Sequence, residues 1–327
     1  MCIRDSNNSL LAKTPKVLRV GMVTDVGGVN DQSFNQSAWE GLQKAKTELG
    51  VKVSYLESKQ DADYPSNLET MYDSENDLIW GIGFKMADAV RLSARQNPEQ
   101  KYAIIDYSYG DKTPKNLVAI KFKAEQGAFL AGYISAKMSK SGVIGFVGGM
   151  NVPIINDFQY GYKAGAKYAN PKIQVLDQFA ESFSDAAKGK AIANQMFAKK
   201  VDVVFHAAGG VGDGVIEAAK EKNKYAVGVD RDQNYMAPNN VITSSLKRVD
   251  RAIYQVVEEL KKGQFPGGTT IELGLESGAV DIAETTDKLI PIIILEKVKE
   301  IKSDIIAKKI KVPTTAQEYA AFEKVMK

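Results

Sequence analysis

Short apolar runs alternate with amphipathic stretches along most of the chain. Each run has the length of a β-strand, ends in a polar or glycine-containing turn, and is followed by residues with helical spacing. The predicted strands are 18–25, 51–57, 78–84, 102–107, 118–122, 143–149, 173–179, 201–208, 225–230 and 241–246. Because the runs are apolar at consecutive positions, we expect strands buried on both faces of parallel sheets.

The stretches between the runs predict the connecting helices. Residues 34–49 place five apolar side chains on one helical face. Further helices are predicted at 125–138, 249–263 and 295–310. These strand–helix units are too many for a single sheet. Their number favours an α/β protein with two doubly wound, parallel-sheet lobes. A β-like pair at 269–283, late in the chain, predicts that the chain crosses between the lobes more than once.

Composition narrows the possible functions. The 327 residues suffice for about two domains, and 44% apolar with 25% charged residues is ordinary for a globular protein. A net charge of +3 does not indicate nucleic-acid binding. No apolar run approaches the roughly 18 residues of a membrane span. One cysteine and one histidine exclude a disulfide framework and Cys/His zinc sites, and His206 is better explained as structural than as a catalytic base.

Charged side chains lie where predicted strands end. Asp25 follows the first strand, Asp106 the fourth, and Asp230 and Lys247 the last two. Ligands of open parallel sheets bind beyond these carboxyl ends, so the four residues are candidates for a binding site. Structural roles are also open, because Asp25 could stabilise its turn and Asp230 could pair with Lys247 to avoid burial of a lone charge.

Two phenylalanines allow a structural and a functional interpretation. Phe34 stands in the polar stretch 24–36, where it either begins the apolar face of a helix or faces a ligand in a cleft. Phe205 lies in a buried-strand pattern, which is typical of a core residue.

The segment 201–230 has the outline of a dinucleotide-binding unit but lacks its third glycine. Counting from Gly210, Val215 occupies that position, and no phosphate-binding GxxxxGK[ST] loop occurs elsewhere. We therefore predict no nicotinamide or other cofactor, and no metal.

These motifs together resemble the basic membrane protein / purine nucleoside receptor family of bacterial substrate-binding lipoproteins, which serve ABC importers. The similarity extends from about Lys16 to Ile310. Its motifs are GMVTDVGGVNDQSFNQSAWEGL, DLIWGIGF, FKAEQGAFLAGYISAKMSKSGVIGFVGGM, VDVVFHAAGGVGDGV, AVGVDRDQ and TSSLKRVD.

The resemblance implies a type I periplasmic-binding-protein fold, in which three crossings near residues 122, 247 and 282 join two lobes around a ligand. The implied units are residues 15–122 with 248–282 as the first lobe, 123–247 with 283–327 as the second, and 1–14 as a tether or non-native segment. Family members carry a lipid-modified cysteine before such a tether. Cys2 is the candidate, although only Met1 precedes it and it could be incidental.

The implied ligand is a nucleoside, with a purine as the expected base. Its ring would lie between two phenylalanines, its edge would face a carboxylate and an amide, and its ribose would meet an acid and a lysine. The two phenylalanines are Phe34 and Phe205, the carboxylate and the amide are Asp25 and Asn35, and the acid and the lysine are Asp230 and Lys247. Asp106, at a strand end, and Gly209, in a loop, are also predicted to bind the ligand.

The resemblance further implies a binder rather than an enzyme, which works outside the cytoplasm as a monomer with an ABC permease as partner. It implies no nucleic-acid partner and no membrane contact beyond a lipid anchor. Three alternatives stay open. They are a binder of another small ligand such as a sugar, a nucleoside hydrolase using a metal at Asp25 and Asp31, and a transcriptional regulator, for which no DNA-binding module is visible.

Overall fold

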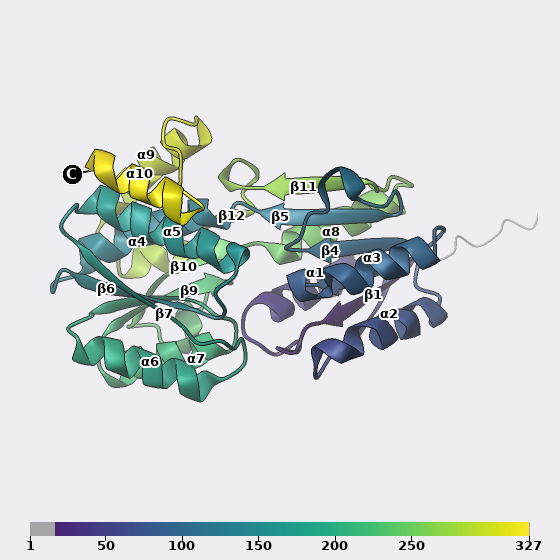
Figure 1. Ribbon diagram of the computed structural model, residues 1–327, viewed down its shortest axis with the longest axis horizontal. Coiled ribbons are helices and arrows are strands. Elements are labelled where there is room, and N and C mark those ends of the chain that lie inside the picture. Colours follow the sequence, from purple (N-terminus) through teal and green to yellow (C-terminus); the bar gives the residue numbers. More distant parts are fainter. Residues whose placement is uncertain (1–16, 327) are drawn as a thin grey trace, which may run out of the picture.

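Two α/β lobes lie side by side in the computed structural model, which describes residues 17–326 (Figure 1). The strands of the first lobe are β1 (Arg19–Thr24), β2 (Lys52–Glu57), β3 (Leu78–Ile82), β4 (Lys101–Ile105), β5 (Leu117–Phe122) and β11 (Thr269–Leu273). Those of the second are β6 (Val143–Gly148), β7 (Gln174–Phe179), β8 (Val203–Ala207), β9 (Tyr225–Asp230), β10 (Val241–Lys247) and β12 (Val280–Ile282).

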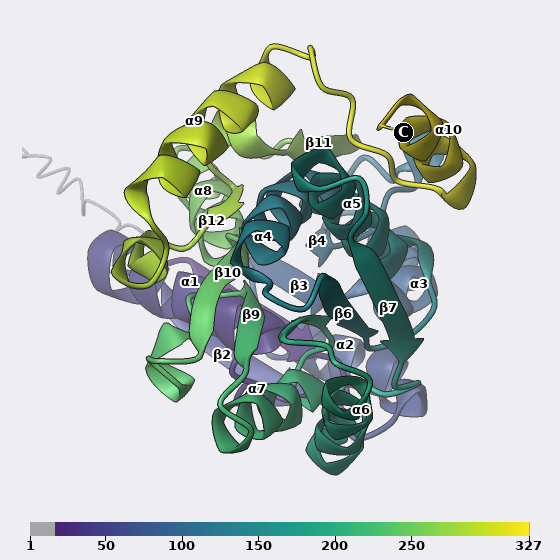
Figure 2. The ribbon, with the colours of Figure 1, turned by 90° about the vertical axis from the view of Figure 1, so that its left-hand side faces the viewer.

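Helices cover both faces of each sheet. The first lobe has α1 (Phe34–Leu49), α2 (Tyr64–Asp73), α3 (Ala87–Gln96) and α8 (Val249–Lys261). The second has α4 (Ala124–Met138), α5 (Pro153–Ala169), α6 (Ala186–Ala198), α7 (Val211–Glu221), α9 (Ile292–Ile306) and α10 (Ala316–Met326). Figure 2 shows α9 and α10 on the outside of α4 and α5.

The two sheets share one topology. Their strand orders are β11-β5-β4-β3-β1-β2 and β12-β10-β9-β8-β6-β7, and every paired neighbour is parallel except β12, which runs antiparallel to β10. All five residues of β3 and of β8 are buried, as expected for strands covered by helices on both faces. The prediction of two doubly wound lobes is confirmed.

The chain passes between the sheets three times. It leaves the first sheet after β5, returns to it after β10, and leaves again between β11 and β12. The predicted boundary at residue 282 is too late, because β12 pairs with β10 in the second sheet. Strands β11 and β12 follow each other in sequence, and residues 274–279 between them carry the chain from one sheet to the other.

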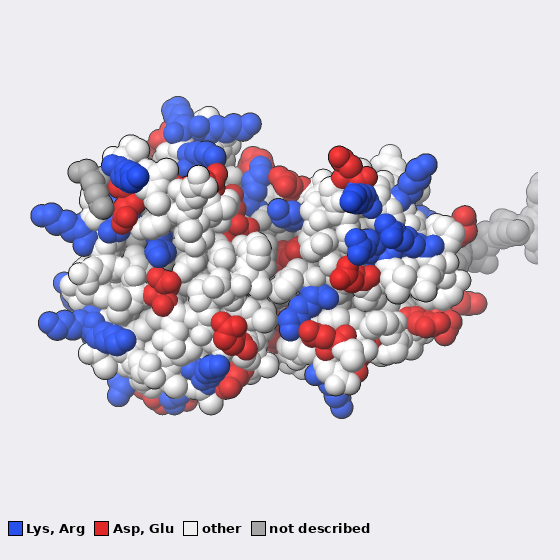
Figure 3. Space-filling model, viewed as in Figure 1, with Lys and Arg blue, Asp and Glu red and all other residues white. Residues whose placement is uncertain are grey.

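The predicted tether, residues 1–14, lies outside the described residues together with Cys2. Among the residues that are described, no helix has the length and apolar character needed to cross a membrane. Acidic and basic side chains are interspersed on the face shown in Figure 3, where the junction of the lobes forms a furrow. That face therefore carries no continuous basic surface of the kind that binds nucleic acid.

Close contact between α4 and α5 depends on glycines. A Cβ atom at Gly165 would lie 1.9 Å from the carbonyl oxygen of Phe129, and one at Gly132 would lie 2.1 Å from that of Tyr162. The two helix backbones thus approach more closely than any side chain at these positions would allow.

We predict that Gly165→Ala lowers the free energy of unfolding by about 1–3 kcal/mol, because the two helices must move apart. Urea-induced unfolding measures the change. Gly210→Ala is the matched control, since the added Cβ would lie at an ordinary 3.5 Å from its nearest neighbour. Equal stability of the two variants would contradict this account of the helix pair.

Candidate ligand-binding site

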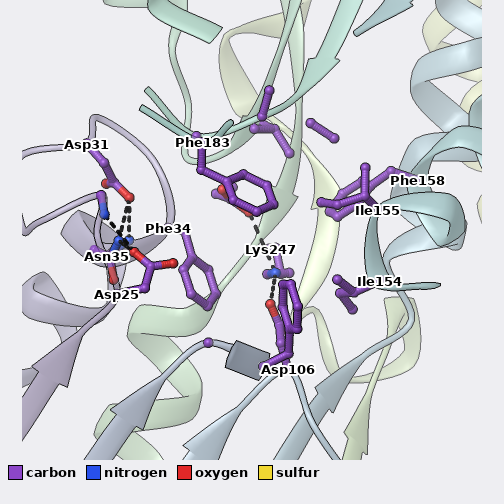
Figure 4. Close-up of a pocket in the computed structure, with 18 residues that line it drawn as sticks. Asp25, Asp31, Phe34, Asn35, Asp106, Ile154, Ile155, Phe158, Phe183 and Lys247 are labelled. Carbon is purple, nitrogen blue, oxygen red and sulfur yellow. Dashed lines mark hydrogen bonds and ion pairs between the residues drawn. The ribbon is translucent and has the colours of Figure 1, made fainter. Parts of the chain in front are cut away.

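A cavity lies between the lobes, beyond the carboxyl ends of the parallel strands (Figure 4). The lining residues are Asp25, Gly27, Asp31, Phe34, Asn35, Gly83, Phe84, Asp106, Ile154, Ile155, Phe158, Phe183, Ala207, Ala208, Gly209, Val229, Asp230 and Lys247. They come from both lobes, so closure of the lobes completes the site.

Most of the residues predicted from the sequence are brought together here. Those that line the cavity are Asp25, Phe34, Asn35, Asp106, Gly209, Asp230 and Lys247. Asp106, which was predicted from its place at a strand end rather than from a motif, is among them.

Phe205 is the exception, and its predicted place in the cavity is wrong. Its side chain is fully buried in the core of the second lobe. There its ring centroid lies 5.0 Å from that of Tyr162 and 5.6 Å from that of Phe146. The cavity is reached two residues later by Ala207, at the end of β8.

The aromatic ring supplied by the second lobe belongs to Phe183 instead. Phe183 lies between β7 and α6 and points into the cavity toward the side occupied by Phe34, at the start of α1 (Figure 4). Phe84, which follows β3, adds another ring to the lining. Sequence reasoning missed both residues, because the strand-end rule was not applied to the strand before Phe183 and Phe84 was counted as the last residue of its strand.

Asp31 organises the loop that carries Phe34. Its buried carboxylate accepts hydrogen bonds from the backbone N–H groups of Ser33, Asn35 and Gln36, at 2.8–3.0 Å. It therefore stabilises the first turn of α1, where backbone donors have no partner within the helix. Burial raises the pKa of Asp31 to about 6, against the effect of these bonds.

Asn35 and Asp25 form one hydrogen-bonded unit on the cavity wall. The Asn35 side-chain nitrogen donates to Oδ1 of Asp25 at 2.8 Å and to Oδ2 of Asp31 at 3.0 Å. Oδ1 of Asp25 also accepts from the backbone N–H of Gly27 at 2.9 Å. Burial raises the pKa of Asp25, while the bonds from Gly27 and Asn35 lower it. Oδ1 of Asn35 has no hydrogen-bond partner among the described residues.

Lys247 lies between two aspartates, one from each lobe. Its ammonium nitrogen is 2.6 Å from Oδ2 of Asp106 and 4.0 Å from Oδ1 of Asp230, and it lies 4.5 Å from the centre of the Phe34 ring. The hydroxyl of Ser33 donates to Oδ2 of Asp230. Within the described part of the chain, Oδ1 of Asp106 and Oδ1 of Asp230 are buried and have no hydrogen-bond partner.

The two aspartates occupy equivalent places in the two lobes. Asp106 follows β4 and Asp230 ends β9, which are third in their respective sheet orders. Both have left-handed backbones, with φ of 68° and 62°. Aspartate tolerates this conformation better than most residues, and strained backbone of this kind occurs preferentially at functional sites. Burial raises the pKa of Asp230, whereas Lys247 lowers it.

The cavity offers several kinds of group that can bind a ligand. The only histidine, His206, is buried away from the cavity lining. No three acidic, histidine or cysteine residues within 17–326 are grouped so that they could hold a metal ion. What the cavity offers is aromatic surface, carboxylate acceptors and one buried cation.

Comparison with known proteins agrees with this geometry. The sequence model of a family described as "ABC transporter substrate-binding protein PnrA-like" matches residues 18–316. The chain is 43% identical to basic membrane protein A of Borreliella burgdorferi, over 97% of this chain and 93% of that protein. It is also 43% identical to the CD4+ T-cell-stimulating antigen of Listeria monocytogenes, over 94% and 92% of the two chains.

Solved structures extend the comparison. A solute-binding protein of an ABC transporter system from Aeropyrum pernix superimposes with a TM-score of 0.85 at 28% identity, covering 94% of this chain and 97% of that one. One from Conexibacter woesei, at 19% identity with a TM-score of 0.76, shows the shared fold. Such proteins bind a substrate outside the cytoplasm for a permease and do not convert it. The chain therefore belongs to the PnrA-like family of ABC transporter substrate-binding proteins.

Proposed function

We propose that the protein binds a purine nucleoside between its lobes and delivers it to the permease of an ABC importer. The observation that carries this proposal is the pair of carboxylate oxygens on either side of Lys247, Oδ1 of Asp106 and Oδ1 of Asp230, which have no hydrogen-bond partner in the described part of the chain. The two vicinal hydroxyls of a ribose are donors that can satisfy both oxygens.

The ribose would gain most of its binding energy at this pair. A hydrogen bond to a charged group contributes about 1.5–3 kcal/mol net, and an unsatisfied buried acceptor is costly. Lys247 offsets the burial of the two carboxylates and could also donate to a sugar oxygen. Because Asp106 and Asp230 belong to different lobes, a diol that bridges them favours closure.

The base would lie among the aromatic side chains. Stacking of a base on an aromatic ring contributes about 1–3 kcal/mol, and Phe34 and Phe183 offer one ring from each lobe. In this proposal Phe183 takes the role that the sequence predicted for Phe205.

The edge of the base would be read by Asp25 and Asn35. Both hydrogens of the Asn35 amide are already donated to carboxylates, so the remaining groups here are acceptors, Oδ1 of Asn35 and Oδ2 of Asp25. They require N–H donors on the ligand. Guanine and hypoxanthine carry N1–H and adenine carries an exocyclic amino group, so an acceptor pair suits purines as a class.

A sugar is the second candidate, since pyranoses also stack on aromatic rings. The lining favours a nucleoside, because a sugar needs polar partners all around its ring. Here Ile154, Ile155 and Phe158 form a continuous apolar wall on the α5 side (Figure 4). The lipid anchor at Cys2 and the monomeric state stay predictions.

A thermal-shift screen tests the proposal with inosine, guanosine, adenosine, uridine, free adenine and ribose. We expect the purine nucleosides to raise the melting temperature, since a ligand at a hundred times its Kd stabilises by about 2.7 kcal/mol. Ribose alone should have no effect. Stabilisation by sugars only would show that the proposed ligand class is wrong. Chromatography after incubation should recover intact nucleoside, whereas free base would point to hydrolysis.

A further inference from the structure

A buried hydrogen-bonded pair behind the cavity links the two lobes. His206, in β8, and Gln233, just after β9, are both fully buried in the second lobe, and neither lines the cavity. Gln233 nevertheless reaches the first lobe, where its side-chain nitrogen donates to the backbone carbonyl of Gln32 at 3.0 Å. Nothing in the proposed ligand site uses this pair.

The hydrogen bonds determine how the Gln233 amide is oriented. Its oxygen accepts from the backbone N–H of Val229 at 2.9 Å, and a backbone N–H can only donate. The same oxygen lies 2.9 Å from Nε2 of His206, so that nitrogen must carry the proton. With the oxygen held by two donors, the amide nitrogen is left to face the first lobe.

The surroundings of His206 fit this role. Burial lowers its pKa to about 4, so the ring is neutral at physiological pH. Nδ1, which can only accept in this tautomer, has no hydrogen-bond partner within residues 17–326. A Cβ atom at residue 212 would lie 2.0 Å from the imidazole ring, so only glycine leaves room for it. Gly212 thus accommodates the histidine, which gives this glycine in the first turn of α7 a structural purpose.

The backbone carbonyl of Gln32, which accepts the hydrogen bond from Gln233, lies in a strained part of the loop between β1 and α1. Gln32 has a left-handed backbone with φ of 55° and directly precedes Ser33, which donates to Asp230, and Phe34. Two other buried bonds join the lobes, from Ser33 to Asp230 and from Lys247 to Asp106, but both involve aspartates that line the cavity. The ion pair between Arg231 and Glu40, at 2.6 Å, is exposed and contributes little, so the buried bond from Gln233 carries more weight than that pair.

We propose that Gln233, oriented by His206, is a positioning residue that holds residues 32–34 of the first lobe against the second lobe when the lobes close. Closure places Phe34 at the cavity and Ser33 at Asp230, so Gln233 sets affinity without touching the ligand. The role depends on lobe closure and not on which small molecule is bound.

Gln233→Glu tests this role selectively. The carboxylate keeps an oxygen for Val229 and His206 but presents a second acceptor to the carbonyl of Gln32, so only the bond between the lobes is lost. We expect a longer distance between labels on Lys59→Cys and Lys188→Cys, one in each lobe, in a Cys2→Ser background. Affinity for inosine should fall about two- to tenfold, the range for one hydrogen bond.

Lowering the pH should rescue this variant. A protonated carboxyl regains an O–H donor, and burial raises the pKa of such a group. As the pH is lowered from about 8.5 to about 5.5, the label distance should return toward the wild-type value. His206, Asp230, Arg231 and Asp232 are the charged or titratable groups around residue 233. Wild-type protein and the exposed control Gln178→Glu are therefore measured in parallel, and neither should show the shift.

Wild-type label distances in Gln233→Glu at the higher pH would overturn the proposal. Selective ¹⁵N labelling of glutamine gives a second measurement that needs no variant at residue 233. The side-chain amide protons of Gln233 should exchange slowly with solvent, and fast exchange would also overturn it. Inosine could fail to bind the wild-type protein while Gln233→Glu still lengthens the label distance. In that case the proposed ligand is wrong and the positioning role stands.

Discussion

Lys247→Met is expected to lower the free energy of unfolding by about 3–5 kcal/mol near pH 8, because it removes the cation from between two buried carboxylates. The ammonium group lies 2.6 Å from Asp106 and 4.0 Å from Asp230, and its side chain is 4% exposed. Methionine keeps the length and volume of the side chain, so the loss is electrostatic rather than a cavity effect. Chemical unfolding at fixed pH measures it, and the exposed Lys299→Met serves as the control.

The loss in this variant should depend on pH in a defined direction. Burial already raises the pKa of Asp230, and Lys247 opposes that shift. Without the lysine, the folded-state pKa rises further above the unfolded value of about 3.9. The folded state then binds more protons than the unfolded state, so stability falls as pH rises between those two values. A variant that becomes less stable on acidification relative to wild type would contradict this assignment.

The same variant should also bind nucleoside more weakly at neutral pH. Without the cation, the pKa of Asp230 rises further, and a protonated carboxyl is a poorer acceptor for a ribose hydroxyl. Stability and affinity should therefore decline together, whereas Lys299→Met should change neither.

The sequence predicted the architecture well because the signals for it are local. Continuous apolar runs indicated strands buried on both faces, and the positions of Asp25, Asp106, Asp230 and Lys247 at strand ends placed them in one cavity. This rule depends only on strand direction and connectivity, so it holds without knowledge of side-chain packing.

The errors arose where the outcome depended on packing or on long-range pairing. Strand β12 lies next to β11 in sequence but pairs with β10. The sequence did not predict this pairing, because a strand of three residues has too short a pattern to indicate its sheet. The unpaired oxygens of Asp106 and Asp230, and the bond from Gln233 to Gln32, exist only once both lobes are assembled. No local pattern predicts contacts between residues that lie so far apart in sequence.

Phe183 and Phe205 should respond to alanine substitution in opposite ways. Phe183 is half-buried and faces the cavity, so Phe183→Ala should weaken purine nucleoside binding by about 1–3 kcal/mol, roughly 5- to 150-fold, with little change in stability. Phe205 is fully buried among Phe146, Phe158 and Tyr162, so Phe205→Ala should cost about 3–5 kcal/mol of unfolding free energy.

Calorimetric titration with inosine measures the affinity of both variants, and urea unfolding measures their stability. Phe34→Ala is the corresponding variant in the first lobe. Phe34→Ala should lose about as much affinity as Phe183→Ala if the base lies between the two rings. Should Phe205→Ala remain stable and lose affinity instead, the base would have to enter a space now filled by the core. That outcome would require the second lobe to repack around the ligand, because β8 and its aromatic neighbours leave no room for a base in the present arrangement.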